Sequence, residues 1–117
     1  MVKLFVDDER NRPNKYWYPA KRFHEAIIYL ERRNVSLLSL DHDLADENGT
    51  GYDICLWMIK NLPPAHWPGN IILHSSNPVG VANMQQLLAT YKPTNCGLLV
   101  VSYDSNFDEN VMKLINQ

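Results

Sequence analysis

The residues of this chain that could do chemistry occur in three short groups, and each group directly follows an apolar run. They are carboxylates, imidazoles and short polar side chains, namely Asp7, Asp8, Asp41, His42, Asp43, His74, Ser75, Ser76 and Asn77. Carboxylates that converge repel one another unless a cation lies among them, and oxygen ligands favour hard ions such as Mg²⁺. Neighbouring imidazoles extend the choice to Mn²⁺ and suit proton transfer near neutral pH. If the groups meet, they predict a divalent metal site whose ligands are Asp7, Asp8, Asp41 and Asp43.

An anion is expected to bind beside that metal. Ser75, Ser76 and Asn77 offer hydroxyl, amide and backbone donors, and they precede a predicted helix whose amino-terminal dipole favours negative charge. Arg10 lies shortly after the first acidic pair, and its guanidinium group is suited to binding phosphate oxygens. The combination predicts a place where a phosphate and a metal meet.

The elements that must position these groups alternate along the chain. Four apolar runs predict strands at 2–6, 35–40, 70–73 and 97–101. Apolar residues spaced by three and four predict helices at 20–33, 52–61, 79–91 and 107–115, with Pro19 suited to the first turn of the first one. This alternation predicts an α/β fold of three layers, with a parallel sheet of about four strands covered by helices on both faces. Residues 1–117 are expected to form a single domain.

Sites in open α/β sheets lie outside the carboxyl ends of the strands, and all three polar groups follow strand ends. Ser102, Tyr103 and Asp104 follow the last strand, whereas the opposite strand ends carry no comparable pattern. An isolated Asp at a strand end is more often a turn or cap residue. Three ionisable groups in a row at Asp41–Asp43 have no use in packing, so we expect the groups to converge at one edge.

Composition excludes several classes of partner. The 117 residues carry a net charge of −2, with 45% hydrophobic and 21% charged residues, so no basic field for duplex DNA covers the molecule. No apolar run reaches the length of a membrane span, and no signal-peptide pattern opens the chain. Two cysteines make no disulfide framework, so a cytoplasmic location without a membrane partner is expected.

Four segments carry a resemblance to a known group of proteins. FVDDER, SLDHDL, TGYDICLWM and LHSSNPVG resemble receiver-like proteins, most closely the cyclic-phosphate processing receiver-like family of small phage and bacterial proteins. The likeness runs from Lys3 to about Val101. It implies a receiver- or flavodoxin-like fold, and a partner that is a nucleotide or RNA end carrying a cyclic phosphate.

The resemblance also implies roles for single residues. Asp7 and Asp8 match the acidic pair that holds Mg²⁺ in receivers, and Asp41 matches the phosphoacceptor position. Ser75 matches the hydroxyl position, and Gly51 matches the glycine that begins the following helix.

Three features depart from the receiver pattern. No lysine follows the last strand, and one strand–helix unit is missing before the strand that carries Asp41. These two departures argue against phosphorelay signalling. Two histidines are also added, His42 beside Asp41 and His74 beside Ser75. Their presence suggests that the protein has a catalytic activity of its own.

Three functions stay open at this point. The first is a metal-dependent phosphoesterase that hydrolyses a 2′,3′-cyclic phosphate, with His42 and His74 as general base and acid on opposite sides of phosphorus. Asp41 would then be a metal ligand or a nucleophile. The second is a receiver-like domain phosphorylated on Asp41. The third is a non-catalytic module that binds a nucleotide or phosphorylated end.

Overall fold

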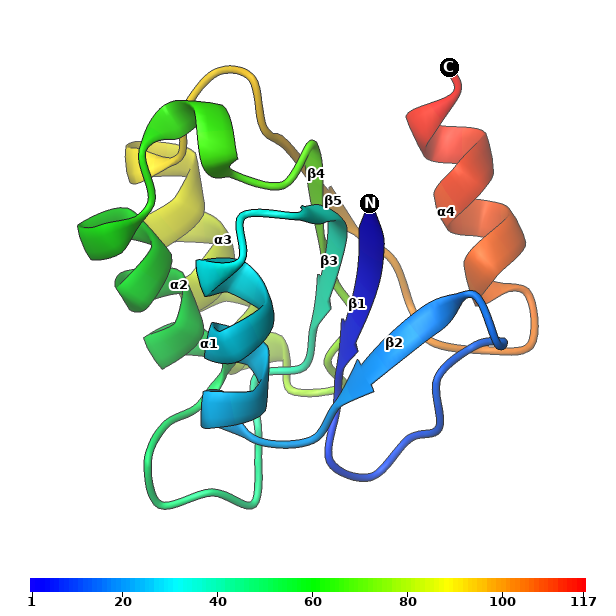
Figure 1. Cartoon of the computed structure of the whole chain (residues 1–117). Helices are drawn as coiled ribbons and strands as arrows, with labels where there is room; N and C mark the ends of the chain where they lie inside the picture. The colour runs from blue at the N-terminus through cyan, green and yellow to red at the C-terminus, as the bar shows by residue number, and fades with distance from the viewer.

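Three of the four apolar runs of the sequence form the inner strands of a parallel sheet, and the fourth forms one of its edges. A computed structural model describes all residues from 1 to 117. Five strands pair in the order β2-β1-β3-β4-β5, and every pairing is parallel (Figure 1). Their bounds are β1 Val2–Val6, β2 Trp17–Ala20, β3 Val35–Leu40, β4 Asn70–Leu73 and β5 Gly97–Val100. The α/β class and the parallel sheet are confirmed, although the sheet has five strands where about four were predicted.

The additional strand is β2, which the sequence analysis treated as loop and as the start of a helix. It pairs with β1 from Lys3 opposite Trp17 to Val6 opposite Ala20. The prediction that Pro19 lies in a first helical turn was wrong, because Pro19 lies in β2 and the helix starts only at Phe23. Proline is tolerated here because β2 is an edge strand, where a missing N–H breaks no ladder.

The connection between β1 and β2 is a loop, residues 7–16. Parallel strands are usually joined by a crossover of a dozen or more residues that contains a helix. The prediction that a whole strand–helix unit is missing was therefore wrong in part, since the strand is present and only the helix is absent. The chain passes directly from the carboxyl end of β1 to an exposed loop and back along the edge of the sheet.

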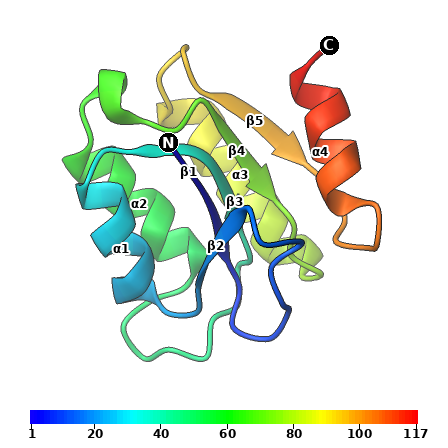
Figure 2. The same ribbon diagram turned by 45° about the vertical axis from the view of Figure 1, so that its right-hand side comes forward.

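The helices cover the two faces unequally. Three helices, α1 Phe23–Glu31, α2 Gly51–Asn61 and α3 Pro78–Tyr91, lie on one face, and α4 Phe107–Ile115 lies alone on the other (Figure 2). A short 3₁₀ turn, η1 Pro64–His66, precedes β4. The larger core packs between the sheet and the three helices, and a smaller aromatic core packs beneath α4. No helix is long and apolar enough to cross a membrane.

Trp17 takes much of the space on the face that α4 covers alone. Its side chain is fully buried, in contact with Phe5 and Phe107. Its indole N–H donates to Asp108 at 2.7 Å, and the Lys3 ammonium lies 5.0 Å from the ring centroid. Edge strand β2 is thus tied to α4 through one aromatic side chain.

Candidate functional site

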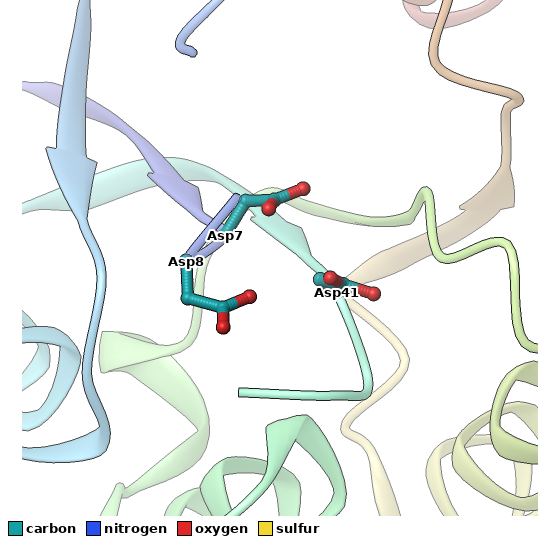
Figure 3. Close-up of side chains that lie close together, drawn as sticks. All are labelled: Asp7, Asp8 and Asp41. Carbon is teal, nitrogen blue, oxygen red and sulfur yellow. The ribbon is translucent and has the colours of Figure 1, made fainter. Parts of the chain in front are cut away.

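An acidic cluster lies at the carboxyl ends of β1 and β3. Asp7 and Asp8 follow β1 and Asp41 follows β3, and one carboxylate oxygen from each lies within 4.8 Å of the others (Figure 3). Asp7 and Asp41 are buried, and Asp8 is half-buried. Neighbouring parallel strands deliver their carboxyl ends to one edge, which is why residues 33 positions apart in sequence meet there.

Asp7 has no acceptor capacity left. One carboxylate oxygen accepts the backbone N–H groups of Glu9 and Arg10, both at 2.9 Å. The other accepts Arg10 Nη1 at 3.2 Å and lies 2.9 Å from His74 Nε2. An ionised carboxylate offers about four lone-pair sites, and four donors fill them here. Burial alone would raise the pKa of Asp7, but the bonds from His74, the two amides and the guanidinium outweigh it and lower that pKa to about 2.

The lowered pKa of Asp7 predicts how the free energy of unfolding of the metal-free protein changes at acid pH. Because the pKa of Asp7 is about 2 when folded and 3.8 ordinarily, its ionised form stabilises the fold above pH 3.8. That contribution, about 2 kcal/mol, is lost as the pH falls from 3.8 toward 2. Urea denaturation of the wild type and of Asp7→Asn, in chelator, should show a stability difference that shrinks over this window. A difference that stays constant with pH would contradict this role of Asp7.

Asp8 and Asp41 are the carboxylates with free lone pairs. The Asp41 side chain is only 8% exposed, yet it accepts no hydrogen bond from the protein, and Arg10 Nη1 is 3.7 Å from its oxygen. Asp8 accepts the Ala45 amide at 2.9 Å through one oxygen, which leaves the other available. The Asp41 oxygens reach the open pocket, and Arg10 is the one cation near the three carboxylates. A further cation would therefore reduce the repulsion among these like charges. The donor set therefore fits a hard divalent cation, held by Asp8 and Asp41, with Asp7 contributing charge.

Asp43, the fourth predicted ligand, lies at the rim and outside this cluster. Its carboxylate binds His42 Nδ1 at 2.9 Å and the Asn77 side-chain amide at 3.1 Å. The bond to His42, followed by the bond to Asn77, lowers the pKa of Asp43. The structure thus places Asp43 in contact with the His42 ring and apart from the carboxylate cluster.

A pocket of about 310 Å³ opens on the acidic cluster. Its walls come from three loops, and they comprise Asp8, Glu9, Arg10, Asp41, Asp43, Leu44, Ala45 and Ser76. A larger hollow of about 610 Å³ lies between α2 and α3, but no carboxylate, lysine or arginine lines it. The smaller pocket is the candidate site, because the metal-binding oxygens and the guanidinium both reach it.

His74 lies beneath the site. It is 2% exposed, its ring stacks on Phe5 at a centroid distance of 4.5 Å, and its two nitrogens contact Asp7 and Ser39 Oγ at 2.9 and 2.6 Å. Its imidazole therefore cannot approach a ligand in the pocket without a rearrangement of the core. Ser39 was not predicted as a site residue, although a polar side chain in a buried strand needs a hydrogen-bond partner.

His42 points toward the α2–α3 hollow and lies against the start of α3. A Cβ atom on Gly80 would come within 2.4 Å of the His42 ring, so only glycine permits this approach. His42 and His74 were predicted to lie on opposite sides of the phosphate. In the structure neither side chain lines the acidic pocket. The side-chain directions differ because one ring packs under α3 and the other under α4.

The predicted anion donors divide among different tasks. Ser76 is exposed and lines the acidic pocket. Asn77 caps α3 by accepting the Gly80 amide at 3.0 Å, and Ser75 Oγ accepts the Asn77 amide at 3.1 Å. Of the three, only Ser76 is placed to meet a ligand in the acidic pocket, and the other two shape the loop that carries it.

Tyr103 lies where the receiver pattern has its lysine, after β5. Its ring packs against Phe5 and Phe107, and its hydroxyl donates to the carbonyl of Asn11 in the β1–β2 loop. Burial, followed by the nearby charge of Asp7, raises the pKa of Tyr103. The residue closes the wall behind Asp7 and supplies no cation.

The comparisons with known proteins agree with this geometry. The model of the cyclic-phosphate processing receiver domain matches residues 2–90, which include β1 to β4 and all three carboxylates of the cluster. β5 and the whole of α4 follow the matched region. Searches of curated proteins and of solved structures gave no match. With its matched segment, sheet order and acidic edge taken together, the chain belongs to the cyclic-phosphate processing receiver domain family.

Proposed function

We propose that this protein is a divalent-metal-dependent phosphoesterase that opens a 2′,3′-cyclic phosphate on a nucleotide or an RNA end. The observation that carries the proposal is the Asp41 carboxylate, which is nearly buried, free of hydrogen bonds and grouped with Asp8. Family membership supplies the link to cyclic phosphates. Mg²⁺ and Mn²⁺ are the ions that suit this oxygen-rich site.

When bound, the metal would neutralise phosphate charge and lower the pKa of a water molecule. Arg10 would act beside it. One guanidinium nitrogen already lies between Asp7 and Asp41, at 3.2 and 3.7 Å, and the planar group has further N–H donors for phosphate oxygens. Arg10 thereby provides, from the β1–β2 loop, the cation that receivers take from a lysine after the last strand.

The reaction breaks one ester bond of the ring. The oxygen of water forms a bond to phosphorus, the bond from phosphorus to O2′ or O3′ breaks, and the freed ribose oxygen takes a proton. The product is a phosphomonoester. His42 lines the neighbouring α2–α3 hollow and contacts Asp43 on the wall of the acidic pocket, so the His42–Asp43 pair is our candidate for moving the proton.

His74 has a different task in this proposal. It is a positioning residue, because it contacts Asp7 and Ser39 from within the core and touches no pocket space. By holding the Asp7 carboxylate, it fixes the partner of Arg10 and so the guanidinium itself.

A non-catalytic module that binds the same phosphate is the second candidate. It is favoured by one observation, namely that neither histidine lines the acidic pocket. A site that neutralises the phosphate without a proton donor for the leaving oxygen would bind the ligand and release it unchanged.

The experiment that separates these functions is turnover of a 2′,3′-cyclic nucleotide, followed by ³¹P NMR with Mg²⁺ or Mn²⁺. We expect hydrolysis that stops in chelator and falls roughly 10²–10⁴-fold in His42→Ala, because a proton carrier is lost. His24→Ala is the control, since His24 is exposed and makes no hydrogen bond.

The other outcomes have distinct meanings. Metal-dependent thermal stabilisation by the nucleotide, without turnover, would establish the binding module. A stable acyl-phosphate on Asp41 after treatment with a small phosphodonor would instead establish a phosphoacceptor domain.

A further inference from the structure

One segment of the chain has an unbalanced positive charge. Residues 10–22, here called the basic segment, hold five of the eleven lysines and arginines and none of the thirteen carboxylates. The remaining residues keep six cations against thirteen carboxylates, a formal charge of −7. The molecule is therefore anionic outside one continuous stretch that is cationic throughout.

Four of the five cations of this segment are open to a partner, whereas Arg10 is paired with Asp7 and Asp41, and Arg12 also donates one bond to the Trp17 carbonyl at 3.0 Å. Arg12, Lys15, Lys21 and Arg22 are all exposed, and none of them forms an ion pair. The segment comprises most of the β1–β2 loop, edge strand β2 and the two residues before α1's first turn. Because no helix joins β1 to β2, strand β2 forms an edge of the sheet that no connecting helix covers (Figures 1 and 2).

One end of the basic segment lies at the acidic pocket, and the other end lies beside the loop that forms part of the pocket wall. At one end, Arg10 contacts Asp7 and lines the pocket. At the other end, the Phe23 amide, next to Arg22, donates to Asp46 at 2.8 Å. Asp46 adjoins Ala45 in the loop that forms the pocket wall. An anionic chain that leaves the pocket along the β1–β2 loop would thus meet the cations of the basic segment.

Exposed aromatic rings are interleaved with the cations. Tyr16 is 65% exposed and Tyr18 is 48% exposed. The Lys15 ammonium lies 5.4 Å from the Tyr16 ring centroid, and Tyr18 makes an edge contact with Tyr29 on α1 at 6.0 Å. These contacts hold the two rings at the surface, where each can offer a face to a flat partner.

Repeated cations along a backbone path, with aromatic faces between them, are the features that bind single-stranded nucleic acid. The aromatic rings favour unpaired bases, since paired bases have no free face to stack. We propose that the basic segment binds the single-stranded RNA that leads to the cyclic-phosphate end in the acidic pocket. This inference rests on the proposed function for the identity of that end.

The test is fluorescence anisotropy of the full chain with a labelled oligouridylate of about ten nucleotides that ends in a 2′,3′-cyclic phosphate. The variant is Lys15→Gln with Lys21→Gln, and the matched control is Lys60→Gln with Lys113→Gln, which removes the same charge from α2 and α4. At about 50 mM salt we expect the first variant to weaken binding roughly tenfold or more, with a salt slope smaller by about 1.4. The control should bind within about twofold of the wild type.

A second variant tests stacking. Tyr16→Ala with Tyr18→Ala leaves the charge unchanged, and we expect at least about fivefold weaker binding with an unaltered salt slope. Both tyrosines are exposed, so folding should be preserved, which thermal unfolding checks.

Three results would overturn this inference. Equal weakening in the lysine variant and its control would show a general charge effect. Unchanged affinity in both segment variants would show that RNA lies elsewhere. Displacement of the RNA by a polyglutamate peptide of equal charge, at equal concentration, would show that the surface fits acidic protein. Because the readout is binding, absence of turnover would defeat the proposed function alone and leave this result standing.

Discussion

Replacing Asp41 with asparagine is expected to reduce turnover of a 2′,3′-cyclic nucleotide by at least about 10²–10³-fold. We also expect Mg²⁺ to stabilise the wild type against thermal unfolding, and the same change should remove that effect, because one of the two carboxylates with free lone pairs is lost. Stability without metal should not fall. The asparagine removes a charge that lies close to Asp7 and Asp8, and the relief of that repulsion offsets the loss of the Arg10 ion pair at 3.7 Å.

Turnover, metal titration by thermal unfolding and urea denaturation in chelator together check this prediction. Glu47→Gln is the matched control, because Glu47 is an exposed carboxylate in the adjacent loop and makes no hydrogen bond. Retention of turnover within about tenfold of the wild type in Asp41→Asn would remove Asp41 from the site. A large loss of metal-free stability would show that Asp41 is a structural residue.

The second large effect is expected at Gly51, where α2 begins. A Cβ atom there would lie 2.1 Å from the carbonyl oxygen of Asp41 and 3.1 Å from the Cα atom of His42. Both are backbone atoms, so no side chain can move aside. Gly51→Ala should therefore destabilise the fold by about 3 kcal/mol or more, measured by urea denaturation. It should also weaken metal binding, since the strain falls on the backbone that carries Asp41.

Gly69→Ala is the control, because an added Cβ atom at Gly69 would meet no severe steric clash. Its added Cβ would meet only the Ser36 carbonyl oxygen, at 3.4 Å, and no glycine in this chain has a positive φ. We expect a change within about 1 kcal/mol and unchanged metal affinity. Equal losses in the two variants would mean that the close approach at Gly51 is not the cause.

Much of the site was predictable because it depends on strand direction alone. Asp7, Asp8 and Asp41 follow apolar runs, and uniformly apolar runs alternating with helices indicate a parallel sheet. Parallel strands bring their carboxyl ends to one edge whatever the details of packing. The acidic cluster therefore followed from the order of residue types, and so did the family resemblance.

Strand β2 was not predictable on the same grounds. It has four residues, one of them proline, and buries Trp17 and Ala20 with two exposed residues between them. That pattern does not alternate with a two-residue period, and its spacing of three also occurs in helices, so nothing local marks the segment as a strand. The strand forms because the edge of β1 offers partners and because Trp17 fills the space under α4.

The roles of the histidines were decided by tertiary structure. Sequence shows only that His42 and His74 follow strand ends, which is compatible with a place in the pocket. Leu73 packs in the larger core, so the alternation of β4 turns His74 to the opposite face, among Phe5 and Phe107. The sequence determined that ionisable groups gather at this edge. Only the packing of helices on each face decided which of them face the ligand and which hold the others in place.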